Sequence, residues 1–279
     1  MTGVQTCALP IFQLTNYNIN VKYGKLIIDS AVITSGDDDS YGFDCDNEIK
    51  PLAGIREWNG IDISDSSSLN IKNSLLRYAM LPIYSSGETF IDSTTIENFV
   101  GRAIDILGNN NHEHSITNSF IRRNYDGLGV GIKYQVGKED IEPQRLTINN
   151  VEIRQCGGSA MELLDNGYNP KPLDVFIENS KFISNGDKAM FMHLMPALDT
   201  LKISNCLIAA NGQGGIFMYD YNGENASIRL EGNMVVGNGY KSLFGAQPTA
   251  IWVDQGKADF INNSVIFNNG TGKIGRAHV

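Results

Sequence analysis

The sequence predicts an all-β protein, a parallel β-helix built from three-stranded coils, and three observations carry this prediction. A nine-residue phrase, Ile-x-Asn-x-x-Ile-x-x-Asn, recurs along the chain. A second phrase, Ala or Gly followed by alternating apolar residues, comes after the first in each well-formed copy. Asn and Gly punctuate every copy, and the apolar residues alternate as in strands instead of following a helical period.

The first phrase is clearest in residues 116–124. Its copies are spaced by about 27 residues on average, which is too irregular for a helical repeat but suits a coil of three short strands joined by turns. A leucine-rich repeat is set aside because its Leu-x-x-Leu-x-Leu signature is absent. The copies begin at Ile71, Ile91, Ile116, Ile148, Ile177, Ile203, Leu230 and Ile261.

The second phrase predicts one strand of each coil. Its six copies begin at Ala103, Gly129, Ala160, Ala189, Gly215 and Ala250. Two apolar residues in each copy should point into the coil and stack on their counterparts about 4.8 Å away, while the variable residue between them points outward. The variable position reads Asp105, Gly131, Glu162, Phe191, Phe217 and Trp252.

The recurring asparagines are expected to be structural. Asn tolerates left-handed backbone, and its amide can bond to the coils above and below in an asparagine ladder. Cys156 falls at such a turn and Cys206 follows Asn205, so both are expected to be buried spacers and not a disulfide.

The two ends of the chain look foreign to the repeats. Residues 1–11 and 273–279 match the translation of a common sequencing adapter and of its reverse complement, and a genuine flexible tail at each end is the alternative. We expect a natural chain with an N-terminal β segment at 12–64 leading into a β-helix at 65–272. That helix would have about eight coils and be truncated at both ends, so a signal peptide or anchor could lie outside it.

Composition narrows the classes of function. The chain is 42% hydrophobic and 19% charged, which suits a packed fold. A formal charge of −9 argues against nucleic acid as a partner. No apolar run approaches the roughly 18 residues of a membrane span. Four cysteines are too few for a disulfide scaffold in a chain of this length.

The phrases at residues 65–270 resemble the right-handed parallel β-helix repeats of the pectate-lyase-like superfamily. The stretch before them resembles the opening of secreted bacterial β-helix proteins, although Glu57-Trp58-Asn59-Gly60 replaces their Gly-Asp-Trp-Gly version. The resemblance implies a right-handed helix in a bacterial extracellular or cell-surface protein. It implies no single activity, because the superfamily holds lyases, hydrolases, epimerases, tailspikes and non-catalytic adhesins. The other matching segments are residues 24–27, 32–40 and 76–79.

An acidic loop is the one candidate metal site. Its carboxylates could hold Ca²⁺, although their spacing does not match an EF-hand. The alternative is a solvated acidic loop, and the sequence predicts no other cofactor. The residues are Asp37, Asp38, Asp39, Asp44 and Asp46.

The outward face of the second phrase is the candidate binding site. Phe191, Phe217 and Trp252 fall on successive coils and should form an aromatic row, with Tyr219, Asp220 and Asp254 beside it. Aromatic rings beside carboxylates suit a sugar polymer. Long insertions are expected to leave the chain after this strand and flank the face. The alternative is that these loops bury the rings as a second small core. The insertions are 133–145, 165–173, 219–226 and 239–249.

Catalysis is less well supported, because no acid–base pair stands out. Asp105 and Glu162 lie two coils apart on one face, which is about 10 Å by stacking and marginal for glycoside hydrolysis. Arg123 is a candidate base for a lyase, and His193 follows the aromatic strand. We expect a protein that binds or processes a polysaccharide. A non-catalytic surface, adhesion or spacer module is the alternative, and a polysaccharide lyase or glycoside hydrolase comes third. The oligomeric state stays open.

Overall fold

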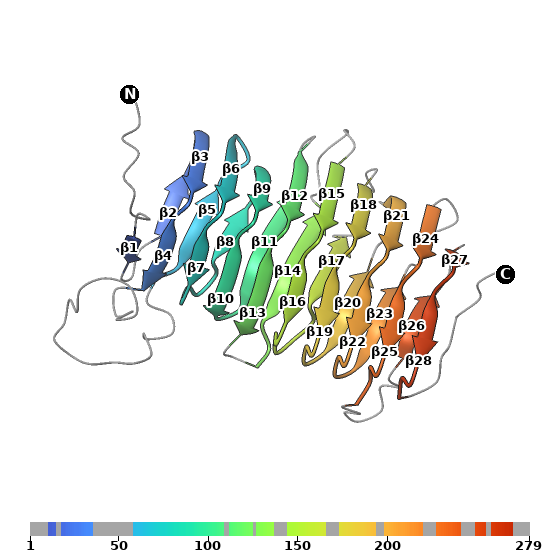
Figure 1. Ribbon diagram of the computed structural model, residues 1–279. Coiled ribbons are helices and arrows are strands. Elements are labelled where there is room, and N and C mark those ends of the chain that lie inside the picture. Colours follow the sequence, from blue (N-terminus) through green and yellow to red (C-terminus); the bar gives the residue numbers. More distant parts are fainter. Residues whose placement is uncertain are drawn as a thin grey trace, which may run out of the picture.

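The computed structural model describes residues 11–14, 18–35, 58–108, 112–124, 127–136, 144–165, 173–193, 198–219, 227–240, 249–254 and 258–269. In these ranges the chain is a solenoid of three parallel sheets, which we call A, B and C (Figure 1). Sheet A consists of β1 (Ile11–Leu14), β4 (Val32–Ser35), β7 (Leu75–Arg77), β10 (Thr95–Phe99), β13 (Phe120–Asn124), β16 (Glu152–Arg154), β19 (Lys181–Ile183), β22 (Leu207–Ala209), β25 (Met234–Val236) and β28 (Ser264–Ile266).

Sheets B and C have nine strands each. Sheet B consists of β2 (Asn18–Val21), β5 (Gly60–Ile63), β8 (Ile83–Ser85), β11 (Arg102–Gly108), β14 (Val130–Val136), β17 (Met161–Asp165), β20 (Lys188–His193), β23 (Gly214–Tyr219) and β26 (Thr249–Asp254). Sheet C consists of β3 (Gly24–Asp29), β6 (Ser67–Lys72), β9 (Glu88–Asp92), β12 (Glu113–Thr117), β15 (Gln144–Asn149), β18 (Leu173–Glu178), β21 (Leu198–Ser204), β24 (Ser227–Glu231) and β27 (Ala258–Ile261).

Each coil runs through sheet B, then C, then A, and every strand pairs in parallel with its equivalent one coil away. The predicted all-β fold of three-stranded parallel coils is therefore confirmed. The described strands form about nine coils where the sequence predicted about eight. The additional coil comes from residues 18–35, because β2, β3 and β4 already belong to the three sheets.

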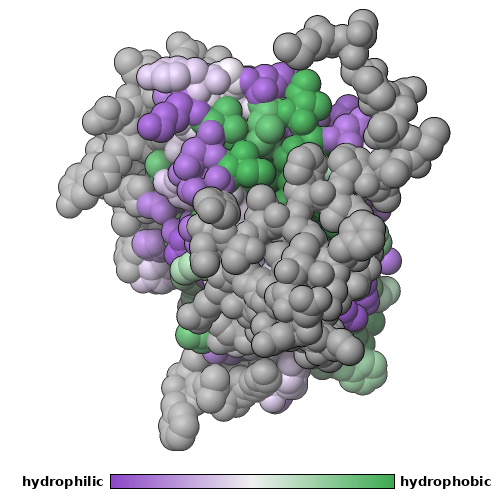
Figure 2. All heavy atoms as spheres, turned by 90° about the vertical axis from the view of Figure 1, so that its left-hand side faces the viewer, coloured by the Kyte–Doolittle hydropathy of each residue, from purple (hydrophilic) through white to green (hydrophobic). Residues whose placement is uncertain are grey.

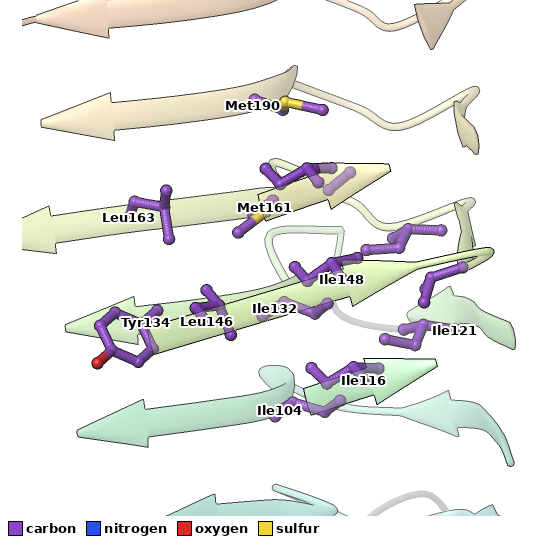
Figure 3. Packing of buried hydrophobic residues seen from close by; sticks show 14 of the residues in the cluster. Ile104, Ile116, Ile121, Ile132, Tyr134, Leu146, Ile148, Met161, Leu163 and Met190 are labelled. Atoms are coloured by element: carbon purple, nitrogen blue, oxygen red, sulfur yellow. The ribbon is translucent and has the colours of Figure 1, made fainter. Parts of the chain in front are cut away.

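Apolar side chains fill the inside of the coils in columns. Ile104, Ile132, Met161 and Met190 are aligned on successive strands of sheet B, and all four are fully buried (Figure 3). Each such side chain contributes roughly 1.5–3 kcal/mol by leaving water. The columns run unbroken from coil to coil, so the core is a continuous rod.

From the second coil on, each coil contains two left-handed residues, one at the corner between sheets C and A and one at the corner between sheets A and B; in the first coil Ser30 is left-handed at the corner between sheets C and A. The first row explains the leading Asn of the repeat, because Asn tolerates positive φ. It consists of Asn73, Ser93, Asn118, Asn150, Asn179, Asn205, Gly232 and Asn262. The second row consists of Tyr78, Asn98, Arg123, Gln155, Ser184, Ala210, Gly237 and Phe267.

Buried asparagines next to the left-handed residues form the predicted ladders. Asn211 Nδ2 donates to Asn238 Oδ1 at 2.8 Å, and Asn185 Nδ2 donates to Asn211 Oδ1 at 2.9 Å. A second ladder joins Asn233 to Asn263 at the corner between sheets C and A. The ladders are confirmed, but left-handed backbone and ladder bonding belong to neighbouring positions and not to one residue.

The two described cysteines occupy ladder positions without forming a disulfide. The backbone N–H of Cys156 donates to Asn185 Oδ1, and that of Cys206 donates to Asn233 Oδ1, each at 3.0 Å. Both thiols are buried and unbridged, so the prediction of buried spacers is confirmed.

The structure corrects the register at two places. Gly131 aligns with Ala160 and is buried, so Lys133 and not Gly131 takes the outward position between Asp105 and Glu162. In the last coil Phe260 and Val265 align with Leu230 and Val235, one residue before the predicted Ile261 and Ile266. Both errors arise where two phases of the sequence fit the same apolar pattern.

One predicted insertion also lies elsewhere. Residues 239–249 come between β25 of sheet A and β26 of sheet B, so they precede the sheet B strand and do not follow it. The other three insertions connect sheet B to sheet C as expected.

The first coil closes one end of the described core. Half-buried Ile19, Val21 and Leu26 pack against the core there, and Figure 2 shows apolar side chains gathered on this end. Among the described residues no helix is long and apolar enough to cross a membrane.

Candidate functional site

The outward face of sheet B carries one side chain per coil in a straight column. Strand alternation turns these residues away from the core, and the pairing register aligns them directly. The column changes character along its length, from polar and charged to aromatic. From the first coil to the last it reads Asn20, Asp62, Tyr84, Asp105, Lys133, Glu162, Phe191, Phe217 and Trp252.

The aromatic cluster consists of Phe191, Phe217, Trp252, Tyr219 and His193. The ring centroids of Phe217 lie 5.7 Å from those of both Phe191 and Trp252, with interplanar angles of 26° and 18°. Because 5.7 Å exceeds the strand spacing of about 4.8 Å, the rings are offset and cover one another only in part. All five side chains are half-buried, so neither full burial nor full exposure of the predicted row is observed.

Tyr219 and His193 form a second column beside the first. The Tyr219 ring lies parallel to the Phe217 ring, with centroids 6.4 Å apart, and the His193 ring lies 5.6 Å from Tyr219. Together the two columns make a patch that is three coils long and, on two of these coils, two side chains wide.

A lysine joins the aromatic cluster to the charged part of the face. Lys188 Nζ lies 5.3 Å from the Phe191 ring centroid and 5.6 Å from that of Phe217, within cation–π range. The same ammonium pairs with Asp187 Oδ1 at 3.0 Å. Ser159 Oγ donates to Asp187 Oδ2 at 3.5 Å, so Asp187 connects the lysine to the previous coil.

The charged cluster consists of Arg102, Asp105, Lys133 and Glu162. Arg102 Nη1 pairs with the buried Asp105 carboxylate at 2.5 Å. Lys133 lies in register between Asp105 and Glu162. Burial raises the pKa of Glu162, although Lys133, Ser159 and Arg102 each oppose that rise. The face therefore holds one carboxylate fixed by a guanidinium and one carboxyl whose environment favours the protonated form.

The structure brings most of the predicted site residues together. Phe191, Phe217, Trp252, Tyr219 and His193 form one patch, and Asp105 and Glu162 share its face. Arg123 does not: it lies exposed on sheet A at the corner leading to sheet B. The backbone of Asp254 pairs with Tyr219, but its side chain and all of Asp220 lie outside the described residues.

The predicted calcium loop also lies outside the described residues, at Asp37, Asp38, Asp39, Asp44 and Asp46. Elsewhere in the described part of the chain, no group of three or more His, Cys, Asp or Glu side chains could hold a metal ion.

Four polar residues of the face were not predicted: Arg102, Ser159, Asp187 and Lys188. Three of them share a signal in the sequence, because Arg102, Ser159 and Lys188 each immediately precede the small residue that opens the second phrase. That position repeats with the coil, so its occupants form a further column on the same edge of sheet B.

The chain was compared with curated proteins, solved structures and protein families. No curated protein matches the chain significantly. Among solved structures, the catalytic domain of a GH87 α-1,3-glucanase in complex with nigerose is similar with a TM-score of 0.27 and 12% identity, over 97% of this chain and 64% of that one. A variant of that domain, also with nigerose, gives the same values.

The chain therefore spans less than two thirds of the glucanase domain, and a TM-score this low carries neither a residue role nor an activity across. The family model described as "Right handed beta helix region" matches residues 59–269. This match covers most of the chain and agrees with the three parallel sheets and with the expected right-handed winding. The protein belongs to the right-handed β-helix family.

Proposed function

We propose that the outward face of sheet B binds a polysaccharide. The observation that carries this proposal is the half-buried aromatic cluster, in which Phe191, Phe217 and Trp252 follow the solenoid axis over three coils. Sugar rings present apolar faces and edges that pack on aromatic side chains, while their hydroxyls need polar partners. Lys188, Asp187 and Glu162 supply such partners directly beside the rings.

The shape of the face favours a chain over a single sugar. The aromatic cluster and the charged cluster lie on consecutive strands of one sheet, so a linear polymer running along the axis would contact both. An extracellular location, expected from the resemblance, is part of this proposal.

Substitution of the central ring tests the binding site. Phe217→Ala removes the ring that contacts both neighbours and should abolish binding to any polysaccharide that the unmodified protein retains on a glycan array. Trp252→Ala removes the ring at the end of the row and should weaken binding about tenfold, because aromatic residues often dominate the energy of an interface. Phe176→Ala, a half-buried outward ring on sheet C, is the matched control and should leave binding unchanged. Equal binding by all four proteins would rule out this face.

Hydrolysis of the bound polymer is a second candidate function, favoured by the two carboxyl groups of the charged cluster. Glu162 has a raised pKa and suits a general acid, whereas Asp105 is held beside Arg102 and suits a general base. They lie two strands apart, about 9.6 Å by strand spacing, at the upper limit of roughly 9.5 Å for inverting enzymes.

Turnover and binding separate this candidate from a non-catalytic surface module. A hydrolase should release new reducing ends from the bound polysaccharide, and Glu162→Gln should lower that rate by at least a hundredfold while leaving binding intact. A lyase would instead produce unsaturated ends that absorb in the ultraviolet. Binding without either product would assign the face to adhesion.

A further inference from the structure

Sheet A presents a second face with a charge opposite to that of the whole protein. Its strands carry five cationic residues and two carboxylates, in a chain whose net charge is −9. The cations are Arg77, Arg122, Arg123, Arg154 and Lys181, and the carboxylates are Glu97 and Glu152. They lie on neighbouring coils, so the positive charge is concentrated in the middle of the solenoid.

Neighbouring contacts neutralise only part of this charge. Glu97 Oε2 accepts hydrogen bonds from Arg122, whose Nε and Nη2 lie 2.8 Å away, and Arg77 Nε lies 3.8 Å from Glu97 Oε1. Glu152 lies between Arg154 Nη1 at 3.3 Å and Lys181 Nζ at 3.9 Å. Arg122 and Arg154 are direct cross-strand partners, an arrangement of like charges that costs stability unless an anion compensates it.

A shallow groove adjoins these cations at the corner between sheets C and A. The groove opens to solvent. It is lined by Asn118, Phe120, Asn150, Val151, Glu152, Asn179 and Lys181. Phe120 is 45% exposed, so its ring is open to a ligand in the groove.

The groove also offers hydrogen-bonding groups. Asn150 Nδ2 donates to Asn118 Oδ1 at 2.8 Å, and Asn179 Nδ2 donates to Asn149 Oδ1 at 2.9 Å. These bonds fix both amides and leave the Oδ1 atoms of Asn150 and Asn179 without a donor among the described residues. Amide oxygens held in this way accept hydrogen bonds from sugar hydroxyls.

We propose that this face of sheet A is a separate binding site for an acidic saccharide that carries carboxylate groups. The ring of Phe120 packs against the apolar face of one sugar, the asparagine amides meet its hydroxyls, and the guanidinium groups pair with carboxylates along the chain. The two faces belong to different sheets, so this site is distinct from the aromatic cluster.

The occupant is a saccharide and not a nucleic acid because the face offers one ring only. The single exposed ring has no aromatic neighbour on its column, where a base-stacking surface would need several.

The test compares an oligouronide with its fully methyl-esterified counterpart by calorimetry at low and at 0.5 M salt. The acid should bind at low salt and lose affinity at high salt, and the neutral ester should not bind. The double variant Arg123→Gln/Lys181→Gln should weaken binding of the oligouronide about five- to tenfold, because each exposed ion pair with a saccharide carboxylate contributes up to about 1 kcal/mol. Gln suits position 123, since Gln155 has the same left-handed backbone one coil on. Phe120→Ala should also weaken binding.

Control variants keep the proposal falsifiable. Lys202→Gln/Arg229→Gln removes the same charge from sheet C and should have no effect. Equal losses in both double variants, equal binding of the ester, or unchanged binding by Phe120→Ala would each overturn the inference. So would tighter binding of a single-stranded oligonucleotide through the same residues. If Trp252→Ala alone abolished oligouronide binding, the sheet B proposal would stand and this one would fall.

Discussion

The two halves of the solenoid treat buried polar groups differently. In the C-terminal half, buried polar side chains lie at the corners and bond fully to the coils on either side. Asn211 is completely buried and makes hydrogen bonds to Asn185, Asn238 and the Phe182 carbonyl. In the N-terminal half, Ser74 and Ser119 bond to the neighbouring coil at the corner between sheets C and A, but further buried polar side chains lie inside the coils near the corner between sheets B and C.

His114, Tyr134 and Gln144 form that internal polar cluster. Tyr134 Oη donates to Gln144 Oε1 at 2.6 Å, and the His114 ring lies 5.6 Å from the Tyr134 ring. Neither His114 nitrogen has a partner in the described part of the chain, nor does Gln144 Nε2. Gly108 makes room for the cluster, because a Cβ there would lie 2.3 Å from Tyr134 Oη.

The same positions in later coils are apolar. Leu163, Met192 and Met218 align with Tyr134 on sheet B and are buried. The same coil therefore accepts either polar or apolar side chains at this inward position, but their contributions to the stability of the fold differ. A buried amide with all its bonds stabilises the fold, whereas a buried nitrogen without a partner costs about 1–3 kcal/mol. Four substitutions test this contrast.

Acid should destabilise the protein through His114. Burial, with a smaller contribution from His112, lowers the pKa of His114 to about 3 in the folded state. In the unfolded chain His114 takes up a proton near pH 6.5, whereas in the folded chain it stays neutral down to about pH 3. The free energy of unfolding therefore falls as the pH is lowered from about 6.5 to 3. At about 1.36 kcal/mol per unit the loss reaches about 4–5 kcal/mol. The measurement is urea unfolding at pH 7, 5 and 4.

His114→Leu isolates this effect, because the difference between variant and parent removes the contribution of the carboxylates. The variant should be more stable at every pH, and the gap should widen with acid. A gap that stays constant between pH 7 and 4 would show that His114 titrates normally.

Loss of one ladder amide should have the next largest effect. Asn211→Ala removes the acceptor of the Asn185 backbone N–H and the amide that donates to the Phe182 carbonyl and to Asn238 Oδ1 in a dry environment, so it should cost on the order of 3 kcal/mol in urea unfolding. Asn205→Gly is the control, since Gly232 occupies the equivalent left-handed position one coil on, and it should change stability little. Similar costs for both would refute a special role for the ladder.

The Tyr134–Gln144 pair should show the asymmetry of a buried hydrogen bond. Tyr134→Phe alone strands Gln144 Oε1 and should cost about 1–3 kcal/mol, whereas Tyr134→Phe/Gln144→Leu should be within about 1 kcal/mol of the parent. A thermal melt of the parent, single and double variants measures this. A double variant less stable than the single one would mean that the polar cluster supports the fold.

The smallest effect is expected at Glu162. Its pKa is raised by burial, so the ionised form costs free energy above that pKa. Glu162→Gln should therefore stabilise the protein at pH 7 by less than about 1 kcal/mol, and the gain should vanish below the pKa, where Glu162 is protonated. Glu231→Gln, on a half-buried carboxylate paired with Arg229, should give no gain.

The sequence was sufficient for the coil and for the aromatic face, because both follow from a strict alternation. Once Phe191, Phe217 and Trp252 occupied one phase of the repeat, stacking aligned them. Alternation does not fix the phase where small and apolar residues are ambiguous, which explains the errors at Gly131 and Ile261. The polar interior was not predicted either, because the inward position of Tyr134 follows only once the register at Lys133 is known.

Side-chain direction at corners was also beyond the sequence. Arg123 comes shortly before β14, the sheet B strand that carries Lys133, yet it belongs to β13 of sheet A and has a left-handed backbone. Ion pairs such as Arg102 with Asp105 depend on rotamers that a periodic pattern does not encode.

The two buried cysteines can report on local opening of the solenoid. Burial raises the pKa of both thiols, that of Cys206 to about 12, so neither reacts with an alkylating reagent while its coil is closed. Cys156 lies at the corner between sheets A and B, and Cys206 at the corner between sheets C and A. The rate at which each thiol is labelled under native conditions therefore measures how often its own corner opens. A stack of repeats that unzips from one end would label the two sites at different rates.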